Sequence, residues 1–553
     1  MGPFGGGFWG RKMARLAGGL IRFFVVLLVL AISAEGLAQA PPDPNFERDE
    51  VFPSYQAFKD ELNEIVATVD AGERTTRLNT LWSNLRAAGQ VPYAQGNQYA
   101  LLYRGSASTV AFAGDHNNWQ PNSGPATRLT GTDLWMREGT LPTDARVDYK
   151  VVTNGSNWLL DPANPLQMWS GFGPNSELRM PAYEYPHETI RRPGVARGAL
   201  GGNVRVSSAN LGYQVQYRVY TPAGYSAQEL ANLPVAYVTD GHEYSADYMG
   251  STTAVLDNLI ADGTLRPTIA VFIDPRDPSN LGNNRRIAEY NLNAAFANFV
   301  AGELVPAIDA AYRTSATADD RVILGTSMGG LNSAYFGAAK GDVFHRIGIQ
   351  SPAFSYNSSI YDLYEKAPTA PLKIFMTAGT INDGNGGPTM SAILAEHGYD
   401  YTFTQANEGH SWGNWRAQLA DLFSALVGPP EQAPGDFNGD LRVDAADFTV
   451  WRDSLGQQME PGRGADGNNN GTIDEADYLV WKAHFAMVYN SNGGQGGQSL
   501  AVPEPSAGGL VGTGLAVGLV GSRCRVLCSE NSSCRWAAER RQLRGCLRQS
   551  GRN

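Results

Sequence analysis

The sequence predicts a multidomain protein whose largest domain is a doubly wound, mostly parallel α/β sheet, with a β-sandwich before it and a small helical domain after it. Three observations lead to this prediction. Short apolar strands alternate with helical periodicity between residues 200 and 428. Short apolar runs separated by Gly, Asn, Pro and Asp turns fill residues 96–190. A repeat with a period of 30 residues, marked by acidic positions, occupies residues 436–485.

Length and charge set the first limits on function. The chain has 553 residues, which is more than one ordinary domain contains. It has 43 Lys and Arg against 54 Asp and Glu, a formal net charge of −11. This balance argues against nucleic acid as a partner, because phosphate binding needs a basic surface. All four cysteines are in the C-terminal tail, so we expect no disulfide and no thiolate metal site in the folded body.

Both ends of the chain are predicted to be address segments. Residues 1–40 combine basic residues, the apolar run 23–32 and the small-residue site Ala38-Gln39-Ala40, which predicts an export signal peptide, with a retained anchor helix as the alternative. Residues 491–553 form a linker and a tail. Its Pro503-Glu504-Pro505 motif, apolar stretch and basic end resemble the bacterial PEP C-terminal sorting signal; the alternative is a disordered tail with a chance tripeptide. We expect a secreted or cell-envelope protein that contacts the membrane transiently through these two segments.

Residues 41–95 are predicted to be helical. Phe58, Leu62, Ile65 and Val69 recur at helical spacing, and the pattern stops before the sandwich.

Residues 96–190 are predicted to form the β-sandwich. The motifs Ala113–Trp119, Leu134-Trp135, Val147–Val151 and Trp158 follow one another in this order. Their order resembles the immunoglobulin-like early-set domain of glycogen-binding modules, which also precedes the catalytic domain of some esterases. The resemblance implies tryptophans that stack on sugar rings. The interpretation that Trp119, Trp135 and Trp158 are core residues is favoured.

The strongest catalytic signal is Gly325-Thr326-Ser327-Met328-Gly329, which follows the strand 322–324 and precedes a helix. A G-x-S-x-G between strand and helix is the nucleophile elbow of an α/β-hydrolase. The turn is too tight for side chains beside the serine, and the helix N-terminus favours developing negative charge. Ser327 is therefore the predicted nucleophile, and residues 191–428 are the predicted α/β-hydrolase domain.

The base and the acid should follow the nucleophile, because the order in an α/β-hydrolase is serine, acid, histidine. His410 lies in a loop after the strand 401–404 and before the last helix. Asp383 lies in the loop after the preceding strand, 372–376, from which it would hold the imidazole ring in one tautomer. Glu408 is the rival acid, disfavoured because it lies so close to His410 in the same loop.

An oxyanion hole needs two N–H donors. One is the backbone N–H of Met328, the residue after the nucleophile. The other is the backbone N–H of Gly241 or His242, in the loop after the strand 235–239, where glycine would let the backbone approach the substrate oxygen. No cofactor is expected for this chemistry.

These motifs together resemble the esterase D family of α/β-hydrolases, which includes enterochelin esterases and the feruloyl and acetyl-xylan esterases. The resemblance covers residues 200–428. Its marks are Thr239–His242, Arg286–Glu289, Glu303–Pro306, Gly325–Gly330, Gly379-Thr380 with Asp383, and Gly409-His410. The acid loop departs from the family pattern, because it has an extra residue, Ile381, and a Gly/Asn-rich run after Asp383.

The repeat contains two loops with oxygen-bearing side chains at positions 1, 3, 5, 9 and 12 and a backbone carbonyl at position 7, as calcium requires. The predicted ligands are Asp436, Asn438, Asp440, Arg442, Asp444 and Asp447 in the first loop, and Asp466, Asn468, Asn470, Thr472, Asp474 and Asp477 in the second. Position 6 is Gly471 in the second loop but Leu441 in the first, so we expect the first site to be weaker. The two loops, each followed by a helix, resemble a type I dockerin, predicted over residues 429–490. The resemblance implies two structural calcium ions and a cohesin-like protein partner.

Together these features favour an exported serine esterase acting on a carbohydrate-linked ester, such as a feruloyl or acetyl group on xylan. A siderophore esterase of the enterochelin type is the alternative among enzymes. A non-catalytic surface-binding protein with a degenerate hydrolase domain is the alternative from another class. The intact Ser, Asp and His in the expected order argue against it.

Overall fold

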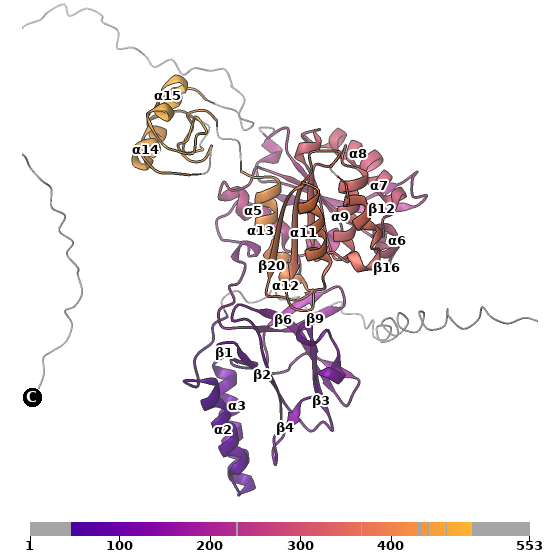
Figure 1. Cartoon of the computed structure of the whole chain (residues 1–553), viewed down its shortest axis with the longest axis vertical. Coiled ribbons are helices and arrows are strands. Elements are labelled where there is room, and N and C mark those ends of the chain that lie inside the picture. The colour runs from indigo at the N-terminus through magenta and orange to yellow at the C-terminus, as the bar shows by residue number, and fades with distance from the viewer. Residues whose placement is uncertain are drawn as a thin grey trace, which may run out of the picture. The chain divides into compact units, whose positions relative to one another are not determined.

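The computed structural model of the chain describes residues 46–227, 230–366, 368–429, 433–439, 442–459 and 462–488. The predicted signal peptide and the predicted sorting segment lie outside the described residues, so both stay predictions. Figure 1 shows the described elements, with the colour running from indigo to yellow along the chain.

Two helices begin the described part of the chain, α2 (Tyr55–Ala67) and α3 (Ala71–Ala87). The Ser54 hydroxyl and the Asp70 carboxylate accept backbone N–H bonds in the first turns, because a short polar side chain at this position replaces the missing intrahelical partner. The apolar faces of both helices pack against the strands that follow. The prediction for Val69 was wrong: α2 ends before it, and Val69 is 94% exposed.

Two antiparallel sheets follow, and we call residues 93–180 the β region. The first has the order β1-β2-β5-β4, and the second has the order β3-β6-β9-β8 with β7 paired to β6. Their bounds are β1 (Tyr93–Gln95), β2 (Gln98–Arg104), β3 (Val110–Gly114), β4 (Thr127–Arg128), β5 (Leu134–Thr140), β6 (Arg146–Thr153), β7 (Asn157–Leu159), β8 (Gln167–Ser170) and β9 (Gly173–Arg179). One buried cluster joins both sheets, including Leu101, Phe112 and Tyr149. The immunoglobulin-like assignment stays a prediction.

The three tryptophans of the predicted sandwich motifs differ in burial. Trp135 is buried in the shared cluster, as a core residue would be. Trp119 and Trp158 are only half-buried. The Trp119 indole donates to the Asp115 carboxylate at 2.9 Å, so this ring is fixed by a polar contact of its own domain.

A nine-stranded sheet follows, with the order β10-β12-β14-β13-β17-β18-β19-β20 and β11 paired to β12. The strands are β10 (Ala199–Leu200), β11 (Val204–Ser207), β12 (Gln214–Thr221), β13 (Val235–Val238), β14 (Ile269–Asp274), β17 (Arg321–Thr326), β18 (Arg346–Gln350), β19 (Lys373–Gly379) and β20 (Asp400–Ala406). The pairs from β14 to β20 are parallel, and β12 is antiparallel to β14. The predicted mostly parallel sheet is therefore confirmed.

Helices cover both faces of this sheet (Figure 1). Along β13, Val235 and Tyr237 belong to one buried cluster and Ala236 and Val238 to the other, since successive side chains of a strand point to opposite faces. Helices α5 (Thr252–Ala261) and α13 (Leu419–Leu426) contribute to the second cluster. Helices α7 (Ala294–Phe299), α8 (Val305–Ala311), α9 (Met328–Ala339), α10 (Ser359–Tyr364) and α11 (Gly386–Glu396) contribute to the first.

Among the described residues, Ala294–Ala311 is the one helical stretch long and apolar enough to cross a membrane by length and composition. Its Phe296, Val300, Leu304 and Ile308 lie in the first buried cluster. The apolar character of this stretch is therefore explained by packing against the sheet.

The repeat forms two helices, α14 (Ala445–Ser454) and α15 (Glu475–His484), each preceded by one of the two loops. The two halves are joined reciprocally. The Trp451 indole donates to the carbonyl of Asp474, and the Trp481 indole donates to the carbonyl of Asp444. The sequence repeat thus corresponds to a structural repeat.

Candidate active site

Ser327 lies in the turn between β17 and α9 with φ +59° and ψ −117°. A non-glycine residue at positive φ is strained, and such strain is typical of functional turns. A Cβ on Gly325 would lie 2.1 Å from Thr239 Oγ1, and one on Gly329 would lie 2.6 Å from the same atom. Only glycine fits on either side of Ser327, because the turn packs directly against the loop after β13.

His410 and Asp383 meet at the carboxyl ends of β20 and β19. The distance between His410 Nδ1 and Asp383 Oδ1 is 2.5 Å. The Asp383 side chain is fully buried, while that of His410 is 40% exposed. The His410 ring also packs edge-on against Trp415, with the ring centres 5.0 Å apart. A buried carboxylate and an aromatic side chain thus hold an imidazole that stays partly exposed.

The second oxygen of Asp383 is held by two further donors. Ser351 Oγ donates to Oδ2 at 2.6 Å, and the backbone N–H of Gly379 donates to the same oxygen at 2.5 Å. Sequence reasoning missed Ser351. The signal that could have found it is its position directly after β18, the strand beside the acid-bearing strand. Ser351 has φ +40°, so it shares the strained geometry of this edge.

Ser327 Oγ makes no hydrogen bond to any of the described residues, so the structure joins the acid to the base but not the base to the serine. Catalytic hydrogen bonds are often long without a substrate and shorten when it binds. The acid–base half of the predicted constellation is brought together, and Ser327 lies at the end of β17, which β18 separates from β19.

The rival acid, Glu408, faces away from the histidine. Its carboxylate accepts from Arg146 Nη1 at 3.2 Å and is 4% exposed. Burial raises the pKa of Glu408 to about 7. This side chain is therefore tied to an arginine of the β region and is geometrically unsuited to orienting His410.

The predicted oxyanion loop follows β13 and forms the short helix α4 (Gly241–Tyr244). Among the described residues, the backbone N–H groups of Gly241, His242 and Met328 have no hydrogen-bond acceptor. The reason for the glycine differs from the expectation. A Cβ on Gly241 would lie 2.3 Å from the backbone carbon of Phe272, so the close approach is to β14 and not to a substrate.

An ion pair fixes this loop to the nucleophile turn. Arg286, in α6 (Arg286–Tyr290), donates to both Asp240 oxygens at 3.0 and 2.9 Å and reaches the carbonyl of Thr326 at 3.5 Å. A planar guanidinium holds a carboxylate in two places at once, which fixes orientation as well as distance. Arg286 thereby couples the two backbone segments that carry the N–H groups.

The two acidic loops before α14 and α15 carry the predicted calcium ligands. Position 1 and position 12 of each loop are buried carboxylates: Asp436 and Asp447 in the first, Asp466 and Asp477 in the second. Among the described residues, no three His, Cys, Asp or Glu side chains gather at one point. The other predicted ligands of each loop are Asp, Asn and Thr side chains and backbone carbonyls, all of which offer oxygen. Two buried carboxylates with amide and carbonyl oxygens are a donor set that fits a hard divalent cation.

The other predicted ligands make hydrogen bonds within the loops or lie outside the described residues. The carboxylates of Asp444 and Asp474 cap the N-termini of α14 and α15. The backbone N–H of Asn470 donates to Asp466 Oδ1, and that of Thr472 donates to Asn470 Oδ1, so backbone donors of the loop orient these two predicted ligand oxygens. Asp440 lies outside the described residues. The remaining predicted ligands, Asn438, Arg442 and Asn468, lie in the described parts of their loops.

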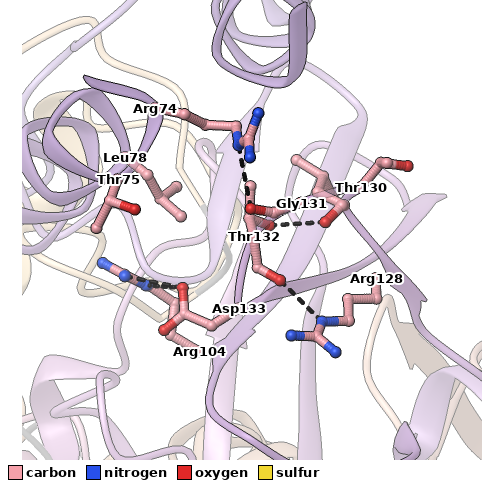
Figure 2. A pocket seen from close by; sticks show the side chains of 10 residues that line it. Arg74, Thr75, Leu78, Arg104, Arg128, Thr130, Gly131, Thr132 and Asp133 are labelled. Carbon is pink, nitrogen blue, oxygen red and sulfur yellow. Dashed lines mark hydrogen bonds and ion pairs between the residues drawn. The ribbon is translucent and has the colours of Figure 1, made fainter. Parts of the chain in front are cut away.

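A cavity of about 640 Å³ lies between α3 and the loop that joins β4 to β5 (Figure 2). Its lining residues are far in sequence from the catalytic candidates and from the calcium loops. It is lined by Arg74, Arg104 and Arg128. Their guanidinium groups are already used to hold the loop. They bind, respectively, Gly131 O, Asp133 Oδ1 and Thr132 O. These arginines are explained by the structure they stabilise.

Comparisons with known proteins identify two domains. Residues 208–378 match the Esterase family model, described as "Putative esterase", and residues 434–486 match the type I dockerin domain. Ser327 lies inside the first match, and Asp383 and His410 follow it.

Three relatives illustrate the similarity. An endo-1,4-beta-xylanase/feruloyl esterase of Xylanibacter ruminicola is 26% identical over 228 residues, which are 40% of this chain and 30% of that protein. An iron(III) enterobactin esterase of Dickeya dadantii is 27% identical over 367 residues, 57% of this chain and 81% of that protein. A crystal structure of the enterobactin esterase from Shigella flexneri superposes with a TM-score of 0.50 at 20% identity, covering 62% of this chain and 98% of that one.

The chain spans only about a third of the length of the Xylanibacter protein, whereas it covers most of the two enterobactin esterases. The structural similarity shows a shared fold, and the family match shows the chemical class. The chain therefore carries a carboxylic ester hydrolase with an α/β-hydrolase fold, together with a type I dockerin domain.

Proposed function

We propose that this protein is an exported serine esterase in which Ser327 is the nucleophile, His410 the general base and acid, and Asp383 the group that orients His410. The observation that carries the proposal is the contact between His410 Nδ1 and the buried Asp383 carboxylate, beside a serine held at φ +59°. An Nδ1–H bonded to a carboxylate leaves Nε2 unprotonated and able to accept the serine proton.

The reaction proceeds in two halves. Ser327 Oγ attacks the ester carbonyl while His410 Nε2 takes its proton, and the alcohol leaves with that proton. Water, activated by the same nitrogen, then releases the acid from the acyl-serine. The oxyanion of each tetrahedral intermediate is stabilised by the N–H of Met328 and an N–H from Gly241 or His242, which have no acceptor within the described structure.

Calcium is proposed to serve the dockerin and not the chemistry. The buried Asp436, Asp447, Asp466 and Asp477 would each supply a carboxylate, and the other predicted ligands would complete two oxygen shells. The ion would link the residues of each loop and so stabilise its fold. A dockerin in turn favours a cohesin-like protein partner and an extracellular location.

The substrate is proposed to be an ester carried by a polysaccharide, of the feruloyl or acetyl-xylan type. The dockerin supports this, because a module for assembly outside the cell is suited to an insoluble substrate. The feruloyl esterase similarity of the hydrolase domain points to the same class.

A siderophore ester is the second candidate. The observation that favours it is the length of the similarity to enterobactin esterases, which reaches beyond the hydrolase domain to 57% of the chain. A dockerin has no evident role for a soluble siderophore, so we rank this candidate second.

A substrate panel tests the proposal. The purified chain should hydrolyse p-nitrophenyl acetate, and Ser327→Ala should abolish this activity while the circular dichroism spectrum is unchanged. Among methyl ferulate, acetylated xylan and enterobactin, kcat/KM should be highest for one of the first two. Turnover by Ser327→Ala at the wild-type rate would refute the mechanism, and a preference for enterobactin would reverse the ranking of substrates.

A further inference from the structure

The β region contacts both loops that carry the proposed acid and base. In the base loop, the Arg146 N–H donates to the carbonyl of Asn407 at 3.1 Å, and Arg146 and Glu408 form a parallel β-bridge. In the acid loop, Asn382 Nδ2 donates to the carbonyl of Asp115 at 2.7 Å. The neighbouring Ile381 packs against the buried cluster of the β region. Two loops of the hydrolase domain are thus held by a different domain.

The Arg146 side chain is the centre of this contact. Its guanidinium is 1% exposed and pairs with Asp148 at 2.5 Å, Glu177 at 2.7 Å and Glu408 at 3.2 Å. It also donates to Ser411 Oγ at 3.1 Å. Glu408 and Ser411 stand on either side of Gly409 and His410, so one arginine holds the base loop both before and after the histidine.

The close fit leaves no room for the base loop to shift. A Cβ on Gly409 would lie 2.2 Å from Asp115 Cγ, and one on Gly413 would lie 2.0 Å from Arg146 Cζ. Gly409 has no need of a left-handed backbone, because its φ is not positive in this structure. Glycine is required at both positions by the presence of the β region.

Stability alone is a poor explanation of so many buried charges. Burial raises the pKa of Asp115 and that of Glu408 to about 7. Although burial also opposes ionisation of Glu177, Arg146 and Arg179 hold its pKa at about 2. A buried ionic network is often no more stabilising than an apolar core of the same volume, so a geometric role is the better account of this one.

We propose that Arg146 and Asp115 are positioning residues of the esterase, which fix the base loop and the acid loop so that His410 and Asp383 meet. The inference rests on the proposed catalytic roles of these two residues. It makes the β region part of the machinery that supports catalysis.

Two loop variants test this without removing any of the buried charged side chains. Asn382→Gly removes the hydrogen bond to Asp115 and tolerates the φ of +52° at this position. Gly409→Ala places a methyl group against Asp115. Tyr149→Phe is the matched control, because it removes a buried hydrogen bond to Asp161 within the β region and touches neither loop. Arg146→Met is the direct variant and is informative if it folds.

The assay is p-nitrophenyl acetate hydrolysis in the full chain, with active sites titrated by a fluorophosphonate that labels Ser327. Partial unfolding lowers the fraction of chains labelled, whereas misplacement lowers kcat per labelled site. Because small displacements of catalytic groups cost up to about 100-fold in rate, we expect Asn382→Gly and Gly409→Ala to lose about 10- to 100-fold in kcat per site with KM within about twofold. Tyr149→Phe should keep its kcat per site.

The outcomes separate the two proposals. If Ser327→Ala is inactive but both loop variants keep the wild-type kcat per site, the positioning role is refuted and the catalytic assignment stands. If Ser327→Ala is active, the catalytic assignment itself fails. If Tyr149→Phe loses as much kcat per site as the loop variants, the effect is a general one of the β region and the positioning role is refuted as well.

Discussion

Asp383→Asn is the substitution that tests the proposed acid most sharply. Asn has nearly the same shape as Asp, but one of its two side-chain oxygens is replaced by an NH₂ group that can only donate. Asp383 Oδ2 accepts from the Gly379 N–H, which cannot reverse its role, and from Ser351 Oγ. The asparagine must therefore keep its oxygen on that side. Its NH₂ group then faces His410 Nδ1, which must become an acceptor.

Asp383→Asn therefore holds the His410 ring in the wrong tautomer. With Nδ1 accepting, the proton moves to Nε2, which can then no longer take the proton of Ser327. A triad with this defect loses about 10⁴-fold in kcat, equivalent to about 5 kcal/mol of transition-state stabilisation. The fold should be unaffected, because the substitution keeps volume and two of the three hydrogen bonds.

Glu408→Gln is the matched control. Burial raises the pKa of Glu408 to about 7 and so favours the neutral form, which glutamine imitates while it keeps an oxygen that can accept from Arg146 Nη1. We expect a change in kcat of less than about tenfold. The measurement is kcat for p-nitrophenyl acetate at pH 7. If Asp383→Asn stays within tenfold of the wild type while Glu408→Gln is crippled, the acid is Glu408 and the tautomer argument fails.

Three further predictions concern packing, pH and calcium. Gly325→Ala should lower the free energy of unfolding by about 1–3 kcal/mol in urea denaturation, because its Cβ would lie 2.1 Å from Thr239 Oγ1; unchanged stability would contradict the steric argument. Burial raises the pKa of Glu289 from 4.5 to about 7, so the folded state holds a proton that the unfolded state releases, and stability falls as pH rises through this window. Glu289→Gln should therefore melt at a higher temperature than the wild type at pH 8 but not at pH 4, by differential scanning fluorimetry; equal melting temperatures at pH 8 would count against it. A chelator should expose residues 433–488 to limited proteolysis while ester hydrolysis continues; a resistant segment would remove the calcium proposal.

The parts of the site that could be predicted are those encoded in short stretches of sequence. The glycines around Ser327 and the strands that precede Asp383 and His410 are local patterns. Parallel strands bring their carboxyl ends to one edge, so the chain order alone places these residues near one another. The two acidic loops are likewise contained within a few residues each.

The parts that could not be predicted depend on residues distant in sequence. Ser351 supports Asp383 from the end of the neighbouring strand β18, so its role follows only once the order of the strands in the sheet is known. The reason for Gly241 was misjudged because a glycine in a loop signals a close approach without naming the partner. Here the partner is the backbone of Phe272 in β14.

Arg146 shows how a charge pattern can mislead. The alternation Arg146-Val147-Asp148 in β6 is typical of a strand with one face in water, yet both charged side chains are 1% exposed. Glu408, a partner of Arg146, lies 262 residues further along the chain, beyond the reach of any local pattern. The predicted boundary between sandwich and hydrolase lies between residues 190 and 191. Hydrogen bonds and ion pairs nevertheless join the two segments at the loops that carry Asp383 and His410. A boundary drawn from composition therefore separates segments of sequence, whereas the loops of the proposed esterase site have contacts from both of them.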